Sequence, residues 1–201
     1  MVAFPSDVLD VIKEITITSG HVTHVSYAVS GKRQSRSRNT QVWKFSLRTH
    51  EAMSRAVWQQ LLGFYNRMKG RYTTFTLTLP SSLATPLGAG GGTPLVNGAS
   101  QTGSSVTTDG WPGTTTVLKA GDFVQFDGST KVYGVTQDVT SDSGGNATIT
   151  IDPQLLSSPA NNAAITITSI PFTVAFSDDT LELPIDALFL SSVEIKLEEV
   201  F

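Results

Sequence analysis

The composition of the chain changes abruptly at Pro80. Toward both ends of the chain, aromatic and aliphatic residues alternate with polar ones, as they do in half-buried strands. Between these ends, a run from Ser81 to Ser105 is rich in Ser, Gly, Thr and Ala and is typical of a linker or a long loop. We therefore predict that residues 81–170 form an inserted domain, and that the first and last segments share one sheet system.

The inserted segment contains five short strand patterns separated by turns. The turns are built from Gly, Asp and Ser, which favour tight reversals of the backbone. Short strands at this regular spacing are typical of a small barrel, and we expect an OB-like one. The predicted strands are residues 115–118, 123–126, 132–136, 148–151 and 165–168.

One amphipathic helix is predicted, over about residues 50–69. Thr49 is the expected N-cap, and Glu51 would lie in the first turn, where the helix dipole favours an acid. Gly70 is placed to end the helix in the left-handed conformation. Apolar residues recur at helical spacing and form a face that must pack on the neighbouring strands. These residues are Met53, Val57, Leu61, Phe64 and Met68.

Ahead of the helix, the pattern indicates two short strands around a turn at Ser19-Gly20, a polar loop over 31–39 and a third strand at 42–47. The predicted fold class is therefore mainly β. It consists of a split β-sandwich domain with one α-helix, formed by residues 1–80 and 171–201, and of the small OB-like β-barrel inserted at 81–170.

Charge is spread unevenly along the chain. Residues 1–80 contain eleven Lys and Arg against four acids, a balance of +7, and residues 81–201 contain three Lys against thirteen acids, a balance of −10. Such halves suit head-to-tail contact between copies better than they suit DNA. The densest cationic cluster lies in the polar loop, and its members are Lys32, Arg33, Arg36 and Arg38.

Three roles are open for this loop: a solvated surface, an intersubunit contact facing the acidic half, and a nucleic-acid surface. A nucleic-acid surface would need aromatic side chains between the cations, and Tyr27 and Trp43 lie only at the margins of the loop. We therefore expect no specific nucleic acid as a partner.

Residues that carry catalysis are scarce. The chain has no cysteine, and its histidines at 21, 24 and 50 are spaced poorly for a metal site. The acids of the middle segment invite comparison with glycosidases, but most lie beside Gly or Ser in predicted turns, where Asp bonds its own backbone. We predict no enzyme activity, no metal and no cofactor. The acids in question are Asp109, Asp122, Asp127, Asp138, Asp142 and Asp152.

No stretch of the sequence approaches the roughly 20 apolar residues that span a bilayer. The amino terminus also lacks the basic start and the apolar run of a secretory signal. We therefore expect synthesis in the cytoplasm and no membrane insertion.

The order of features in residues 1–80 is distinctive. A strand pair leads to a Gly-plus-basic segment at 31–36, a strand at 42–47, an amphipathic helix and a Gly-aromatic strand at 70–77. This order, with the closing strand at 193–201, resembles the distal tail proteins of long-tailed (siphovirus) bacteriophages, including the lambda-type minor tail protein. Further segments resemble the small β-barrel inserted in some of these proteins, namely residues 96–103, 109–112, 118–123 and 149–155.

The resemblance implies a structural role in the virion. Proteins of this family form a ring, usually a hexamer, at the distal end of the tail tube, where it joins the tube to the tail-tip hub and the host-binding parts of the baseplate. It implies tail tube and hub proteins as partners, synthesis in the host cytoplasm, and no catalytic residues. Only the segment 31–38 carries over, as a candidate ring or tube contact.

Two alternatives remain open. A carbohydrate-binding or adhesin module of the tail tip would need an exposed aromatic platform for a host surface glycan, and Trp111, in Asp-Gly-Trp-Pro, is the best candidate. A tail-associated glycan hydrolase would need a carboxylate pair at a defined separation.

Overall fold

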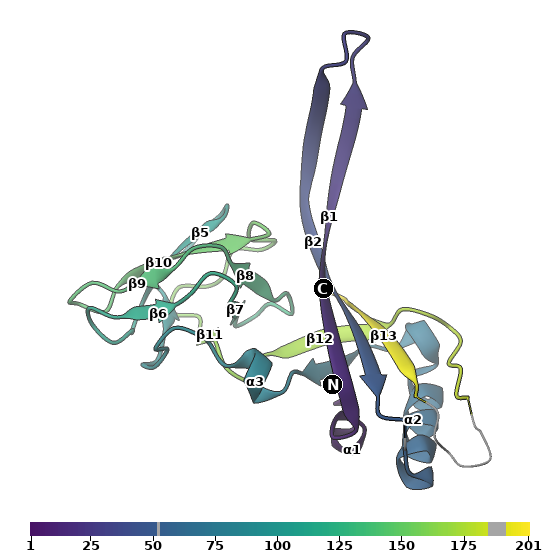
Figure 1. Ribbon diagram of the computed structural model, residues 1–201. Coiled ribbons are helices and arrows are strands. Elements are labelled where there is room, and N and C mark those ends of the chain that lie inside the picture. The colour runs from purple at the N-terminus through teal and green to yellow at the C-terminus, as the bar shows by residue number, and fades with distance from the viewer. Residues whose placement is uncertain (52, 185–191) are drawn as a thin grey trace. The chain divides into compact units, whose positions relative to one another are not determined.

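The computed structural model describes residues 1–51, 53–184 and 192–201 (Figure 1). The chain divides into two compact units, which are described separately. The sheet unit consists of Met1–Gly20, Val42–Leu77 and Phe172–Val200, and the barrel unit consists of His21–Gln41, Thr78–Pro171 and Phe201. Strands dominate both units, which confirms the mainly β class.

The sheet unit contains a five-stranded sheet with the strand order β1-β2-β13-β12-β3. β13 is antiparallel to both of its neighbours and pairs Leu197 with Phe45 of β2 and with Phe176 of β12. The two ends of the chain thus meet in one sheet, which confirms that this domain is split. The strands are β1 (Ile12–Tyr27), β2 (Arg33–Thr49), β3 (Phe75–Thr78), β12 (Pro171–Phe176) and β13 (Glu194–Glu199).

Helix α2 (Arg55–Met68) is shorter than predicted. Ser54 caps it, because its Oγ accepts the N–H of Val57 at 3.5 Å. The predicted cap Thr49 and first-turn acid Glu51 were wrong, because β2 runs through Thr49 and the helix begins only at Arg55. The left-handed conformation predicted for Gly70 is confirmed, with φ 59°, and Lys69 before it shares that conformation, with φ 56°.

The apolar face of α2 packs on the sheet through aromatic rings. The ring of Phe64 lies edge-on to that of Phe75 in β3, with their centroids 5.0 Å apart, and 6.2 Å from that of Phe176 in β12. Phe4, ahead of the one-turn helix α1 (Ser6–Leu9), adds its ring 5.5 Å from that of Phe64. The second layer over the described sheet is therefore a helix. Two further short helices are η1 (Gly70–Tyr72) and α3 (Ser81–Ala84).

β1 and β2 form one long hairpin (Figure 1), which corrects two predictions. No break occurs at Ser19-Gly20, and most of the predicted loop 31–39 is strand, because β2 begins at Arg33. The distal strands bury neither face, so they lack the apolar alternation that marks a half-buried strand.

The barrel unit contains a six-stranded sheet with the order β11-β7-β8-β10-β5-β4. Its two ends meet, since Leu95 bridges Ala164 and the N–H of Val96 donates to the carbonyl of Ala163 at 3.0 Å. The sheet is thus nearly closed on itself, which confirms the predicted small barrel. Its strands are β4 (Leu95–Val96), β5 (Ser105–Asp109), β7 (Phe123–Phe126), β8 (Tyr133–Val135), β10 (Ala147–Asp152) and β11 (Ile165–Thr166). The pair β6 (Thr116–Leu118) and β9 (Val139–Thr140) forms a separate ribbon.

The Gly-rich run that leads into the barrel is packed against it. The N–H groups of Ala89 and Gly90 donate to the carbonyls of Thr116 and Val117, each at 2.9 Å. A Cβ at Gly88 would lie 2.3 Å from the carbonyl oxygen of Val117, so only glycine allows this approach. This part of the run is therefore a loop, one of the two alternatives expected, and it is packed on the barrel instead of being a free linker.

Candidate assembly surface

The distal part of the β1–β2 hairpin, residues 21–39, is here called the arm. Every one of its residues is exposed, although most of them lie in strands. Strands normally bury at least one face, and an isolated two-stranded hairpin is marginally stable in water. The arm therefore offers two uncovered faces to a partner.

The arm reverses direction in a tight turn. The N–H of Gly31 donates to the carbonyl of Ala28 at 2.8 Å, and the N–H of Ala28 donates to the carbonyl of Lys32 at 3.0 Å. Gly31 has a φ of 77°, which side chains disfavour. The turn leaves Val29 and Tyr27 at the tip, with 111% and 70% of their surfaces exposed.

The arm carries cations on both faces. Successive side chains of a strand point to opposite faces, so Arg36 and Arg38 share one face of β2 and Arg33 lies on the other. Lys32 adjoins them at the turn, and the arm contains no acid. The structure thus brings the four sequence-predicted contact residues together on one exposed hairpin.

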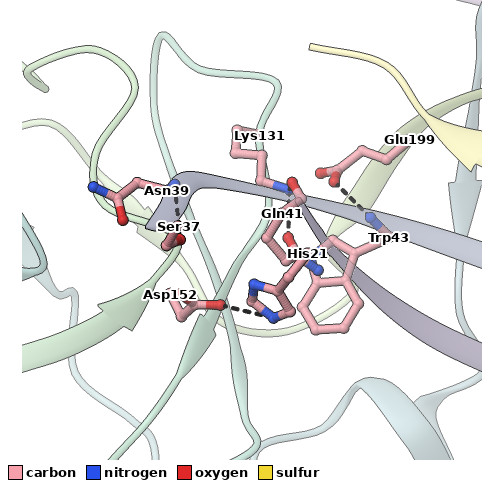
Figure 2. A network of polar contacts seen from close by, with 8 residues as sticks. All are labelled: His21, Ser37, Asn39, Gln41, Trp43, Lys131, Asp152 and Glu199. Atoms are coloured by element: carbon pink, nitrogen blue, oxygen red, sulfur yellow. Dashed lines mark hydrogen bonds and ion pairs between the residues drawn. The ribbon is translucent and has the colours of Figure 1, made fainter. Parts of the chain in front are cut away.

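The root of the arm, here His21 on β1 and residues 39–41 on β2, is held by residues of the barrel (Figure 2). His21 Nε2 lies 3.5 Å from Asp152 Oδ2. On β2, Asn39 Nδ2 donates to the side-chain oxygen of Gln154 at 3.4 Å. These two contacts fasten both strands of the hairpin within the barrel unit.

A buried contact lies at the same root. Lys131 Nζ donates to the carbonyl oxygen of Gln41 at 3.0 Å and to its side-chain Oε1 at 2.8 Å (Figure 2). Only 1% of the surface of Lys131 and none of that of Gln41 is exposed. This pair could not be predicted from the sequence, because nothing local distinguishes a buried lysine from a solvated one.

In the sheet unit, β2 is fastened just beyond the arm. The backbone N–H of Trp43 donates to Glu199 Oε2 at 3.2 Å, and Glu199, in β13, is only 4% exposed. A carboxylate that accepts a backbone N–H inside a sheet is a structural group.

Trp111, the candidate glycan platform, lies in the barrel core. Its surface is only 5% exposed, and its Nε1–H donates to Thr108 Oγ1 at 2.8 Å. The hydroxyl of Thr108 in turn donates to the carbonyl of Ala147 at 2.9 Å. The indole therefore has no exposed face on which a sugar could stack, which corrects the expectation of an exposed platform.

Three of the barrel acids serve turns, as predicted. Asp122 accepts the backbone N–H groups of Lys119 and Leu87 at 2.8 and 2.9 Å, and Asp138 accepts that of Ala120 at 3.0 Å. Asp142 closes the turn before β10. Hydrogen bonds from the side chain and backbone of Asn146, followed by those from Gly144 and Gly145, hold the pKa of Asp142 below its ordinary value.

Within residues 1–51, 53–184 and 192–201, no group of three or more His, Asp or Glu side chains is placed to hold a metal ion. In the same ranges, no helix has both the length and the apolar character needed to cross a membrane.

The fold and the arm define a class of protein: a split β domain with an inserted closed barrel and an exposed cationic hairpin. Residues 84–170, which include the barrel strands, match the family model described as distal tail protein pb9, B domain. This match shows a likeness to a phage distal tail protein domain over residues 84–170, and it supports a structural role in a phage tail. A search of curated proteins finds no significant match.

Proposed function

We propose that this protein forms a ring at the distal end of a siphovirus tail tube and connects the tube to the tail-tip hub and the host-binding parts. The observation that carries the proposal is the arm, whose residues 21–39 are exposed throughout. The match of residues 84–170 to a distal tail protein domain supports its placement in the tail.

The size of the arm supports its use as an interface. A specific protein interface takes roughly 20–30 residues from each partner. The arm supplies nineteen residues, all exposed, from a single hairpin. Covering even one of its faces would compensate for a hairpin that is marginal by itself.

Charge favours a second copy of the chain as the partner of the arm. The arm holds four cations and no acid, whereas residues 81–201 carry a net charge of −10. A cationic arm on an acidic surface of the next subunit is a head-to-tail contact, and such contacts close a ring when the rotation between subunits closes. We expect a hexamer, with the tail tube and hub proteins bound to its two faces.

The proposed role requires no catalytic chemistry, and Asp122, Asp138 and Asp142 each hold backbone N–H groups in turns. The adhesin alternative required Trp111 to be exposed, and Trp111 is buried. A structural connector is therefore the function that the geometry supports best.

Native mass spectrometry of the purified protein, alone and with the tail tube protein of the same phage, tests the proposal. We expect a single closed oligomer, or a monomer that closes into one when the tube protein is added. A monomer that persists in both conditions and binds neither tube nor hub protein would contradict the proposed function.

A further inference from the structure

The inserted barrel contacts the root of the arm on both strands. We propose that the barrel fixes the direction of the arm through Asp152, Gln154 and Lys131, and so prepares the arm for its partner. The barrel would then support the assembly surface, whatever else it binds. The inference deepens the proposed function, because it concerns how the arm is held ready for assembly.

The grouping of contacts supports this inference. Residues 21–41 cluster with the barrel, whereas the remainder of the same two strands, up to Gly20 and from Val42 onward, clusters with the sheet unit. Chain continuity alone would keep the whole hairpin with its own sheet. The contacts of His21, Asn39 and Gln41 with the barrel agree with this division.

Lys131 supplies the strongest of these contacts. Removing an ammonium from water costs several kcal/mol unless hydrogen bonds replace the lost hydration. Two oxygens of Gln41 accept from Lys131 Nζ, and the ring of Phe201 lies 4.7 Å from it. A movement of β2 at Gln41 would take these oxygens away from a buried charge. Because leaving this charge without partners is unfavourable, the contact keeps β2 in place.

An unusual backbone conformation lies close to this anchor. Asn39 has a φ of 53°, a left-handed conformation that Asn tolerates better than most residues. Its N–H donates to Ser37 Oγ at 3.0 Å (Figure 2). A residue in this conformation bends a strand, as in a β-bulge. Gln154 contacts Asn39 itself, so the barrel holds the arm at this residue.

The contact of His21 with Asp152 completes the support on β1. Both side chains are about half exposed, so this pair contributes little energy by itself. Its value is geometric, because a hairpin held on one strand can still rotate about that strand. Contacts on both strands therefore restrict the arm to one direction relative to the barrel.

A fixed arm favours assembly because ordering a mobile segment during binding weakens the interaction. If only a fraction of arms point correctly, the apparent dissociation constant rises in proportion to the inverse of that fraction. Lys131 would thus influence assembly without touching the partner, which makes it a positioning residue.

The test measures the direction of the arm directly. The chain has no cysteine, so spin labels can be placed at Val29→Cys on the arm tip and at Ser104→Cys on the barrel. Both positions are exposed. Pulsed electron paramagnetic resonance then gives the distribution of distances between the labels.

We expect a narrow distribution in the labelled parent protein and a distribution at least twice as wide after Lys131→Met, which keeps an unbranched side chain of similar size and removes the charged amine. Lys119→Met, at an exposed turn of the same barrel, is the matched control and should change nothing. We also expect Lys131→Met to raise the protein concentration needed for ring closure by roughly tenfold, as for an arm that points correctly about a tenth of the time.

If circular dichroism shows that Lys131→Met unfolds the barrel, the double variant Asp152→Ala and Gln154→Ala tests the same idea at less buried positions. A wider distribution of label distances would support the proposed role of the barrel, and an unchanged width in a folded variant would overturn it. The spin-label measurement does not depend on oligomerisation. A parent protein that never forms a ring would contradict the proposed function and leave this result intact.

Discussion

At the scale of single residues, Trp111 stabilises the barrel from within its core. Its indole is almost completely buried and donates to Thr108, which donates in turn to Ala147 of β10. The side chain therefore links the start of the loop after β5 to the neighbouring strand. Its role is one of packing and hydrogen bonding.

Replacement of this indole should destabilise the barrel. We expect Trp111→Ala to lower the free energy of unfolding by about 3–5 kcal/mol, because it leaves a large cavity. Trp111→Phe should cost less, through lost packing and about 1 kcal/mol for the missing donor to Thr108. Urea denaturation followed by circular dichroism measures both. Unchanged stability of Trp111→Ala, together with loss of binding on a glycan array, would restore the platform hypothesis.

Asp142 gives a prediction about pH. Hydrogen bonds from Asn146 favour the ionised carboxylate, so its pKa in the folded protein is below the ordinary 3.8. A lowered pKa contributes stability that is fully present above pH 3.8 and is lost as the pH falls through the lower folded value. We expect Asn146→Ala to raise the pKa of Asp142 toward 3.8, as measured by NMR titration of its carboxyl carbon.

The control for this titration is Asn161→Ala, which removes an amide at a different turn of the barrel. It should leave the pKa of Asp142 where it is. An Asn146→Ala protein whose Asp142 titrates as in the parent would show that the backbone N–H groups alone set the pKa.

At the scale of elements, the arm carries the assembly hypothesis. Its cations occupy both faces of an exposed hairpin, and the acids that would complement them lie elsewhere in the chain. Exposed cations contribute little to the stability of the monomer that carries them. Their contribution should appear only when a partner is present.

We expect the double reversal Arg36→Glu and Arg38→Glu to leave the unfolding transition unchanged and to weaken ring formation at least tenfold. Like charges facing each other across an interface cost several kcal/mol. Sedimentation velocity measures the loss. The reversal Arg55→Glu and Lys119→Glu changes the net charge equally at exposed sites outside the arm, and it should assemble normally. Equal loss in both variants would point to net charge instead of the arm.

Among the elements, those that bury one apolar face could be predicted from the sequence. The alternation at 42–47 and 123–126 and the helical spacing of Leu61, Phe64 and Met68 all correspond to observed elements. The residue types did not distinguish the true N-cap, because Thr49 and Ser54 can both cap a helix. β5 was missed because its inward residues, Val106 and Thr108, lie in a stretch dominated by small polar residues.

The candidate site was predicted only in part, for physical reasons. The four cations were named from their density in the sequence, but their place on a hairpin was not, because strands without a buried face carry no hydrophobic period. The contacts at the root of the arm join residues ninety or more positions apart in the sequence, and Gln41 with Lys131 is the nearest such pair. Such pairs leave no local signal, and a single sequence cannot reveal them.

At the scale of the whole molecule, two units share one chain that crosses between them at both strands of the hairpin and at both ends of the barrel. Residues 84–170 carry the family match, and the arm, outside that match, carries the proposed contact between copies. The proposed contact between copies therefore depends on residues outside the matched segment 84–170.

Cryo-electron microscopy of purified virions that contain this chain would show how its copies are arranged in the tail. We predict a closed ring at the distal end of the tail tube, with one barrel per subunit and each arm lying on the neighbouring copy. Density for the chain as a single copy, as an open fibre, or with arms that contact no other subunit would contradict the account.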